Sequence, residues 1–260
     1  MKLKFKYSNT RKHEMKIAFI GDSFCSGKAS YSWCMMLSRV LNANILAMGN
    51  GGSNIWDAYK QLISVIDECD VVVMCYTNHS RIPNRKSYPL TPGVVDHHLN
   101  GSKTDVPGDF TENAIWNAAS NYYAHLYDDE YHWLTKQLLV QEMDSLLLRS
   151  NKVCIHFGCF DRIDGTSTGR VTGIATQEPL SYVTWPKGYW EPKSGAWAKQ
   201  TLIEYRELNG LFTISTPEVN ENHMTIDMNA ELASLLEHII KNKKTGSFDL
   251  PGFSKGKQND

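Results

Sequence analysis

Residues 16–24, with the sequence Lys-Ile-Ala-Phe-Ile-Gly-Asp-Ser-Phe, constrain the fold more than any other segment of this chain. The run is apolar and breaks at Gly21, and a segment with helical periodicity begins near Tyr31. Such a run predicts a buried strand whose C-terminal turn presents the Ser23 hydroxyl at the edge of a sheet. Because open α/β sheets bind their ligands at this edge, Ser23 stands where a nucleophile is expected.

Four further strand-like runs follow, and segments with helical periodicity separate most of them. The expected strands are residues 16–20, 45–48, 71–76, 153–157 and 211–215. The expected helices begin near residue 31, after Asn54, near residue 112 and after Thr225. This alternation predicts an α/β fold with a parallel sheet.

Two segments interrupt the alternation and are interpreted as long loop insertions. They cover about residues 80–110, rich in Pro, Asn, Gly and His, and residues 160–200, rich in Gly, Pro, Trp and Tyr. Loops of this length in a compact domain commonly form lids or binding loops, so we expect them to shape a substrate site. We predict one domain over residues 16–243, a basic extension over 1–15 and a flexible basic tail over 244–260.

Composition excludes several classes of function. The 260 residues have a net charge of −1, so no bulk field attracts nucleic acid or a membrane surface. No stretch is long and apolar enough for a signal peptide core or a membrane span, and we therefore expect a cytoplasmic protein. The six cysteines include no C-x-x-C pair, which predicts free thiols, and no histidine spacing indicates zinc. We expect no cofactor and no metal, and the sequence leaves the oligomeric state open.

A phosphate-binding loop is the main competing interpretation of the first strand end. Residues 21–30 resemble the G-x-x-x-x-G-K-[ST] motif between a strand and a helix. Five residues rather than four separate Gly21 from Gly27, and Ala29 stands where a hydroxyl should bind Mg²⁺. Nucleotide binding is therefore disfavoured.

Residue types suited to acyl transfer follow four of the expected strands. Ser23 follows the first, and the second leads into the glycine-rich segment 49–54, whose backbone N–H groups are accessible to an oxyanion. Asn78 follows the third strand and His223 follows the fifth. Because the strands are parallel, these groups are expected at one edge of the sheet.

These four blocks resemble those of the SGNH hydrolases, also called GDSL esterases. Gly-Asp-Ser at 21–23, Gly-Gly-Ser-Asn at 51–54, Asn78 and Asn-His-Met-Thr at 222–225 occur in the family's order. The resemblance implies a three-layer αβα sandwich with a flavodoxin-like, five-stranded parallel sheet of order 2-1-3-4-5. It also implies that Ser23 is the nucleophile and His223 the general base. The oxyanion hole would then consist of the Ser23 and Gly51 N–H groups and the Asn78 amide.

Two blocks depart from the family pattern. The third reads Tyr76-Thr77-Asn78-His79 where Gly-x-Asn-Asp is usual, so Thr77 is an alternative side-chain donor. In the fourth, Asn220 occupies the position of the acid that usually precedes the histidine by three residues. Glu221 or Glu218 are alternatives for that role, and a serine–histidine dyad is another. The family's glycine could correspond to Gly51 or Gly52, and the Gly-x-Ser spacing favours Gly51.

The substrate is expected to be a carboxylic ester, and the second insertion suggests which kind. Trp185 and Trp190 belong to an aromatic cluster there, and aromatic faces stack on sugar rings, so O-acetyl groups on a carbohydrate are a candidate substrate. The alternative for the aromatic residues is a hydrophobic plug that secures the loop. The alternative for the chain is a carbohydrate-binding or structural protein that keeps the SGNH fold without catalysis.

Overall fold

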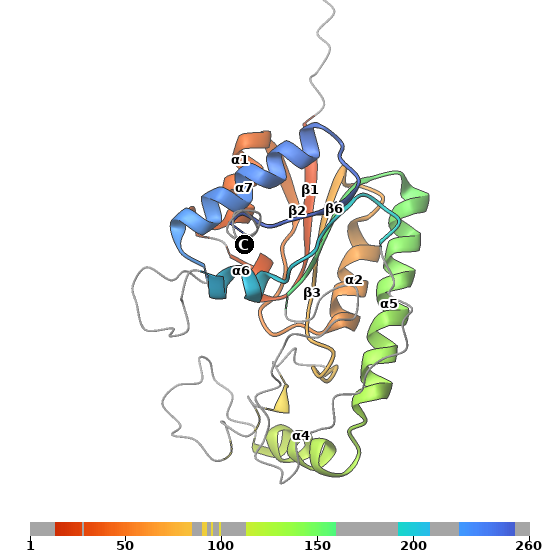
Figure 1. The fold of residues 1–260 in the computed structure, drawn as a ribbon. Helices are drawn as coiled ribbons and strands as arrows, with labels where there is room; N and C mark the ends of the chain where they lie inside the picture. The colour runs from red at the N-terminus through yellow and green to blue at the C-terminus, as the bar shows by residue number, and fades with distance from the viewer. Residues whose placement is uncertain are drawn as a thin grey trace, which may run out of the picture.

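A six-stranded, wholly parallel sheet forms the centre of the molecule (Figure 1). The computed structural model describes residues 14–27, 29–84, 90–92, 95, 99, 113–159, 192–208 and 224–252. The strand order is β2-β1-β3-β4-β5-β6, which confirms the predicted flavodoxin-like order over the first five strands. The strands are β1 (Met15–Gly21), β2 (Ala43–Ala47), β3 (Val71–Tyr76), β4 (Val153–Gly158), β5 (Ala196–Ala198) and β6 (Gly246–Phe248).

Helices cover both faces of this sheet, as predicted for a three-layer sandwich. α1 (Trp33–Leu41) and α7 (Ile226–Lys241) pack together on one face, and α2 (Ile55–Val65) and α5 (Asp129–Ser150) cover the other (Figure 1). Further helical elements are the 3₁₀ turn η1 (Ser23–Cys25), α4 (Asn113–His125) and α6 (Leu202–Leu208).

Alternation along the central strands fills two separate cores. Phe19 lies in the core beneath α1 and α7, whereas its neighbour Ile20 lies in the core beneath α2 and α5. In β3, Val73 and Met74 divide between the two cores in the same way. Strands buried on both faces read as continuous apolar runs, which is why the sequence signal of β1 and β3 is strong.

Polar caps define where the helices start. Asn54 and Asp57 form a capping box at α2, and Thr225 Oγ1 accepts a hydrogen bond from the Met228 N–H at α7. The helical region expected to begin near residue 112 is two helices, α4 and α5. Asp128 separates them because its side chain caps α5 by accepting from the Tyr131 N–H at 2.9 Å.

The last two strands differ from the sequence prediction. The neighbour of β4 in the described sheet is β5, which falls in the segment interpreted as an insertion, and β6 falls in the expected tail. The expected strand over residues 211–215 lies outside the described residues. Three-residue strands are too short to show a period, so tertiary pairing rather than local pattern fixes them. Leu250, just after β6, is fully buried, which ties this segment to the core.

Two expectations from composition concern the whole molecule. All six cysteines are free and buried, as predicted. Among the described helices, none combines the length and apolar composition that a membrane span requires.

Candidate functional site

The turn after β1 holds the predicted nucleophile. Gly21 has φ +143°, and a Cβ there would lie 2.1 Å from the Cys75 carbonyl oxygen, so only glycine lets β1 approach β3 this closely. Asp22 then caps η1, because its Oδ1 accepts from the Phe24 N–H at 3.0 Å. Ser23 begins η1 and is half-buried, and its hydroxyl makes no hydrogen bond within the described part of the chain.

The glycine block is hydrogen-bonded directly to this turn. The Asn50 N–H and the Ser53 hydroxyl both donate to the Gly21 carbonyl, at 3.0 and 2.8 Å. Gly51 lies between them, and a Cβ built on it would meet nothing within 4 Å. The backbone at Gly51 is therefore open on this side, while its neighbours are held against the nucleophile turn.

Asn78 follows β3, the strand that pairs with β1. The register matches Gly21 with Cys75, so Ser23 and Asn78 follow neighbouring strand ends. The Asn78 Oδ1 accepts from the Ser80 N–H at 2.7 Å, which fixes the amide and leaves its NH₂ group as the donor on the other side. Thr77, the alternative donor, is fully buried, whereas Asn78 is half-buried.

His79 stands where the SGNH pattern usually has an acid. Its buried ring approaches Asp129 through Nε2 at 2.9 Å, and the Tyr127 hydroxyl donates to the same Asp129 oxygen at 2.7 Å. The Tyr123 hydroxyl contacts the Ser80 carbonyl at 2.6 Å. These contacts anchor the Asn78 loop to α4, to α5 and to the turn between them.

The predicted histidine block and the predicted aromatic residues are not described. Asn220, Glu221, His223, Trp185 and Trp190 all lie outside the described residues, as does the alternative acid Glu218. Trp197, from the same aromatic cluster in sequence, is in β5, where it packs against the core beneath α2 and α5.

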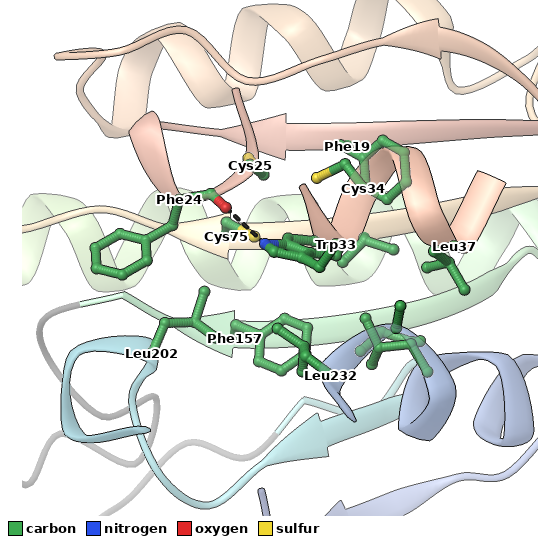
Figure 2. Packing of buried hydrophobic residues seen from close by; sticks show 14 of the residues in the cluster. Phe19, Phe24, Cys25, Trp33, Cys34, Leu37, Cys75, Phe157, Leu202 and Leu232 are labelled. Carbon is green, nitrogen blue, oxygen red and sulfur yellow. Dashed lines mark hydrogen bonds between the residues drawn. The ribbon is translucent and has the colours of Figure 1, made fainter. Parts of the chain in front are cut away.

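The start of α7, which follows His223 in sequence, is held near the nucleophile turn by Trp33. The Trp33 indole N–H donates to the Phe24 carbonyl at 2.8 Å (Figure 2). The Trp33 backbone N–H donates to Asn229 Oδ1, also at 2.8 Å. Trp33 and Asn229 are fully buried, as is Met224. Through its indole and its backbone N–H, Trp33 thus joins the residue after Ser23 to the first turns of α7.

A second serine, histidine and aspartate cluster was missed by sequence reasoning. Ser194, His156 and Asp144 form a buried chain of hydrogen bonds that resembles a catalytic triad in its residue types. The Asp144 carboxylate accepts from the backbone N–H groups of Lys193 and Ser194, each at 2.9 Å, and from the Ser194 hydroxyl. No local signal could have found it, because Asp144 lies within α5 and Ser194 lies in an expected insertion.

The geometry of this cluster differs from that of a working triad. In a triad the serine and the acid bind opposite ring nitrogens of the histidine. Here His156 Nε2 lies 2.8 Å from the Ser194 carbonyl and 3.1 Å from its Oγ, and Asp144 is on the same side at 3.9 Å. A carbonyl only accepts, so Nε2 carries the ring proton, and Nδ1 accepts from the Tyr76 hydroxyl at 2.8 Å.

The nitrogen that faces Ser194 is therefore protonated and cannot act as its base. Burial also lowers the pKa of His156 to about 4, although the charge of Asp144 opposes that shift. This cluster pins the 192–195 segment to α5 and β4.

Among the described residues, no group of three or more His, Cys, Asp or Glu side chains could hold a metal ion.

Comparisons with known proteins add one structural likeness. No protein-family model matches the sequence, and the search of curated proteins finds no relative. A solved structure described as a lipolytic protein of the G-D-S-L family from Desulfitobacterium hafniense is similar at 12% identity with a TM-score of 0.32. The match covers 56% of this chain and 61% of that chain. The parallel order β2-β1-β3-β4-β5 is consistent with the SGNH fold that the sequence resembles.

Proposed function

We propose that this protein is a serine hydrolase of carboxylic esters in which Ser23 is the nucleophile. The observation that carries the proposal is the convergence of three blocks at the ends of β1, β2 and β3. Among the described residues the Ser23 hydroxyl has no hydrogen-bond partner, Gly51 has an open backbone, and Asn78 has a fixed amide. Residue types that acyl transfer requires thus follow neighbouring strand ends, at the edge where α/β sheets bind ligands, and this supports the proposal.

In the proposed reaction, Ser23 Oγ attacks the ester carbonyl and forms a tetrahedral intermediate. His223 takes the hydroxyl proton and returns it to the leaving alcohol, which leaves an acyl group on Ser23. Water, activated by the same imidazole, then releases the acid. The Ser23 and Gly51 N–H groups and the Asn78 amide would stabilise the negative oxygen of each intermediate.

The role of His223 is supported by the contacts around Trp33. Because Trp33 hydrogen-bonds both Phe24 and Asn229, the first turns of α7 are close to the nucleophile turn. His223 immediately precedes the buried Met224, three residues before the first residue of α7. Asn220, Glu221 and Glu218 remain the proposed alternatives for orienting its imidazole.

For the substrate, we propose an ester with a small acyl group, such as an O-acetyl group on a carbohydrate, with Trp185 and Trp190 as sugar-stacking residues. The packing of Trp197 against the core favours a structural role for that member of the aromatic cluster. Trp185→Ala and Trp190→Ala should each raise the KM for an acetylated sugar without changing that for p-nitrophenyl acetate.

Hydrolysis of p-nitrophenyl acetate by purified protein tests the function. We expect turnover by the unmodified protein and by Ser194→Ala, and turnover near background for Ser23→Ala, with circular dichroism confirming that each variant is folded. Equal rates for the unmodified protein and Ser23→Ala would contradict the proposal. Binding of an oligosaccharide without ester turnover would favour the alternative of a non-catalytic protein.

A further inference from the structure

We infer that Arg81 is a positioning residue that holds the three oxyanion-binding blocks in register by pairing with the buried Asp22 carboxylate. The inference rests on the proposed function and deepens it. Its basis is a closed ring of polar contacts beneath Ser23, Gly51 and Asn78, which links residues 21 and 22, Ser53 and Arg81.

Asp22 places a carboxylate in the interior beside the nucleophile. Its side chain is fully buried, and Oδ1 is used by the Phe24 N–H. The second oxygen, Oδ2, has no hydrogen-bond partner among the described residues and lies 3.4 Å from Arg81 Nη1. Cys159 also lies near Asp22, and the charge of Asp22 helps burial to raise the pKa of that thiol to about 12. Arg81 therefore supplies the positive charge that a buried carboxylate needs.

Arg81 also connects the other two blocks. Its Nη1 donates to the Ser53 carbonyl at 2.9 Å, in the glycine block. The Ser53 hydroxyl in turn donates a hydrogen bond to the Gly21 carbonyl at 2.8 Å, which links the glycine block to the nucleophile turn. Arg81 itself lies three residues after Asn78, and its backbone N–H donates to the Asn78 carbonyl at 3.5 Å. Displacing the guanidinium would thus break the contacts that join the Asn78 loop to both the glycine block and Asp22.

The pair has an electrostatic consequence for catalysis as well. The tetrahedral intermediate on Ser23 carries a negative oxygen, and an unneutralised carboxylate on the preceding residue would oppose its formation. Arg81 cancels this charge in a region from which water is excluded, where charges interact strongly. Arg81 is only 9% exposed, so it acts through Asp22 and Ser53 rather than by direct substrate contact.

A charge-removal cycle tests the inference. Arg81→Met should lower kcat for p-nitrophenyl acetate by about 10²-fold, the scale expected when catalytic groups are misplaced by an ångström, with a much smaller change in KM. Asp22→Asn keeps the Oδ1 acceptor for Phe24 but removes the charge. The double variant Asp22→Asn/Arg81→Met should therefore recover about 10-fold of the lost kcat, and Arg81→Lys should retain more activity than Arg81→Met.

Arg149→Met is the matched control, because Arg149 is exposed on α5 and should keep the unmodified kcat. A folded Arg81→Met variant with the same kcat as this control, or a double variant no more active than Arg81→Met, would overturn the inference. If Arg81→Met does not fold, the double variant removes both charges of the Asp22–Arg81 pair, and an unmodified kcat in that variant would also overturn the inference. Absence of turnover in the unmodified protein is a distinct result, which would overturn the proposed function itself.

Discussion

The surroundings of His156 predict how much this side chain makes the free energy of unfolding depend on pH. Its ring is fully buried, with Nε2 bonded to the Ser194 carbonyl and Nδ1 to the Tyr76 hydroxyl. Both contacts suit the neutral ring, and burial lowers its pKa from the ordinary 6.5 to about 4. The perturbation is His156→Gln, which keeps one donor and one acceptor but does not titrate.

The sign follows from comparing the folded and unfolded chains. Below pH 6.5 His156 is protonated in the unfolded chain but stays neutral in the folded chain. The free energy of unfolding therefore falls as the pH falls. The loss ends near pH 4, where the folded form also protonates. At about 1.4 kcal/mol per pH unit, the full change is roughly 3 kcal/mol for this one side chain.

The assay is urea unfolding of the unmodified protein and His156→Gln between pH 4 and pH 8. The difference in the free energy of unfolding between the two proteins should change by roughly 3 kcal/mol between pH 7 and pH 4 and stay flat above pH 7. Proton NMR of the assigned His156 ring should show no titration between pH 5.5 and pH 8. A ring that titrates near pH 6.5, or a pH-independent difference, would refute the buried neutral assignment and reopen a catalytic role for the Ser194 cluster.

Three further predictions test the site and the fold. Asn78→Ala should lower kcat by about 10²–10³-fold with little change in thermal stability, as for loss of one oxyanion donor; an unchanged kcat would exclude Asn78 from that role. Gly21→Ala should prevent stable folding because its Cβ would overlap the Cys75 carbonyl, whereas Gly51→Ala should fold normally, and thermal melting compares the two. Leu250→Ala should lower the free energy of unfolding by about 2–5 kcal/mol; a negligible loss by denaturant titration would mean that the segment after β6 is not part of the core.

The sequence was sufficient to predict the elements whose signal is local. β1 and β3 are apolar runs buried on both faces, and the starts of α2 and α7 carry capping residues, so their approximate positions follow from composition and spacing. The order of the first five strands followed from the family resemblance. Of the proposed site, Ser23, Gly51 and Asn78 were recognisable because each follows a strand with a clear pattern.

The remaining features depend on contacts between distant segments. β5 and β6 are three residues long and are fixed by their partners rather than by their own sequence. Arg81 and Asp22 are 59 positions apart in the sequence, and Asp144 and Ser194 are 50 apart. No sequence periodicity predicts either pairing. The roles of such buried polar residues can be assigned only from the folded structure, in which their partners lie beside them.

Covalent labelling tests the central claim, that Ser23 is the nucleophile, most directly. Purified protein would be incubated with a fluorophosphonate and the modified residue located by peptide mass spectrometry, with Ser23→Ala, Ser194→Ala and Ser26→Ala as parallel samples. The account predicts one adduct, on Ser23, that is absent from Ser23→Ala and present in the other two variants. An adduct on Ser194, or equal labelling of Ser23→Ala and the unmodified protein, would contradict it.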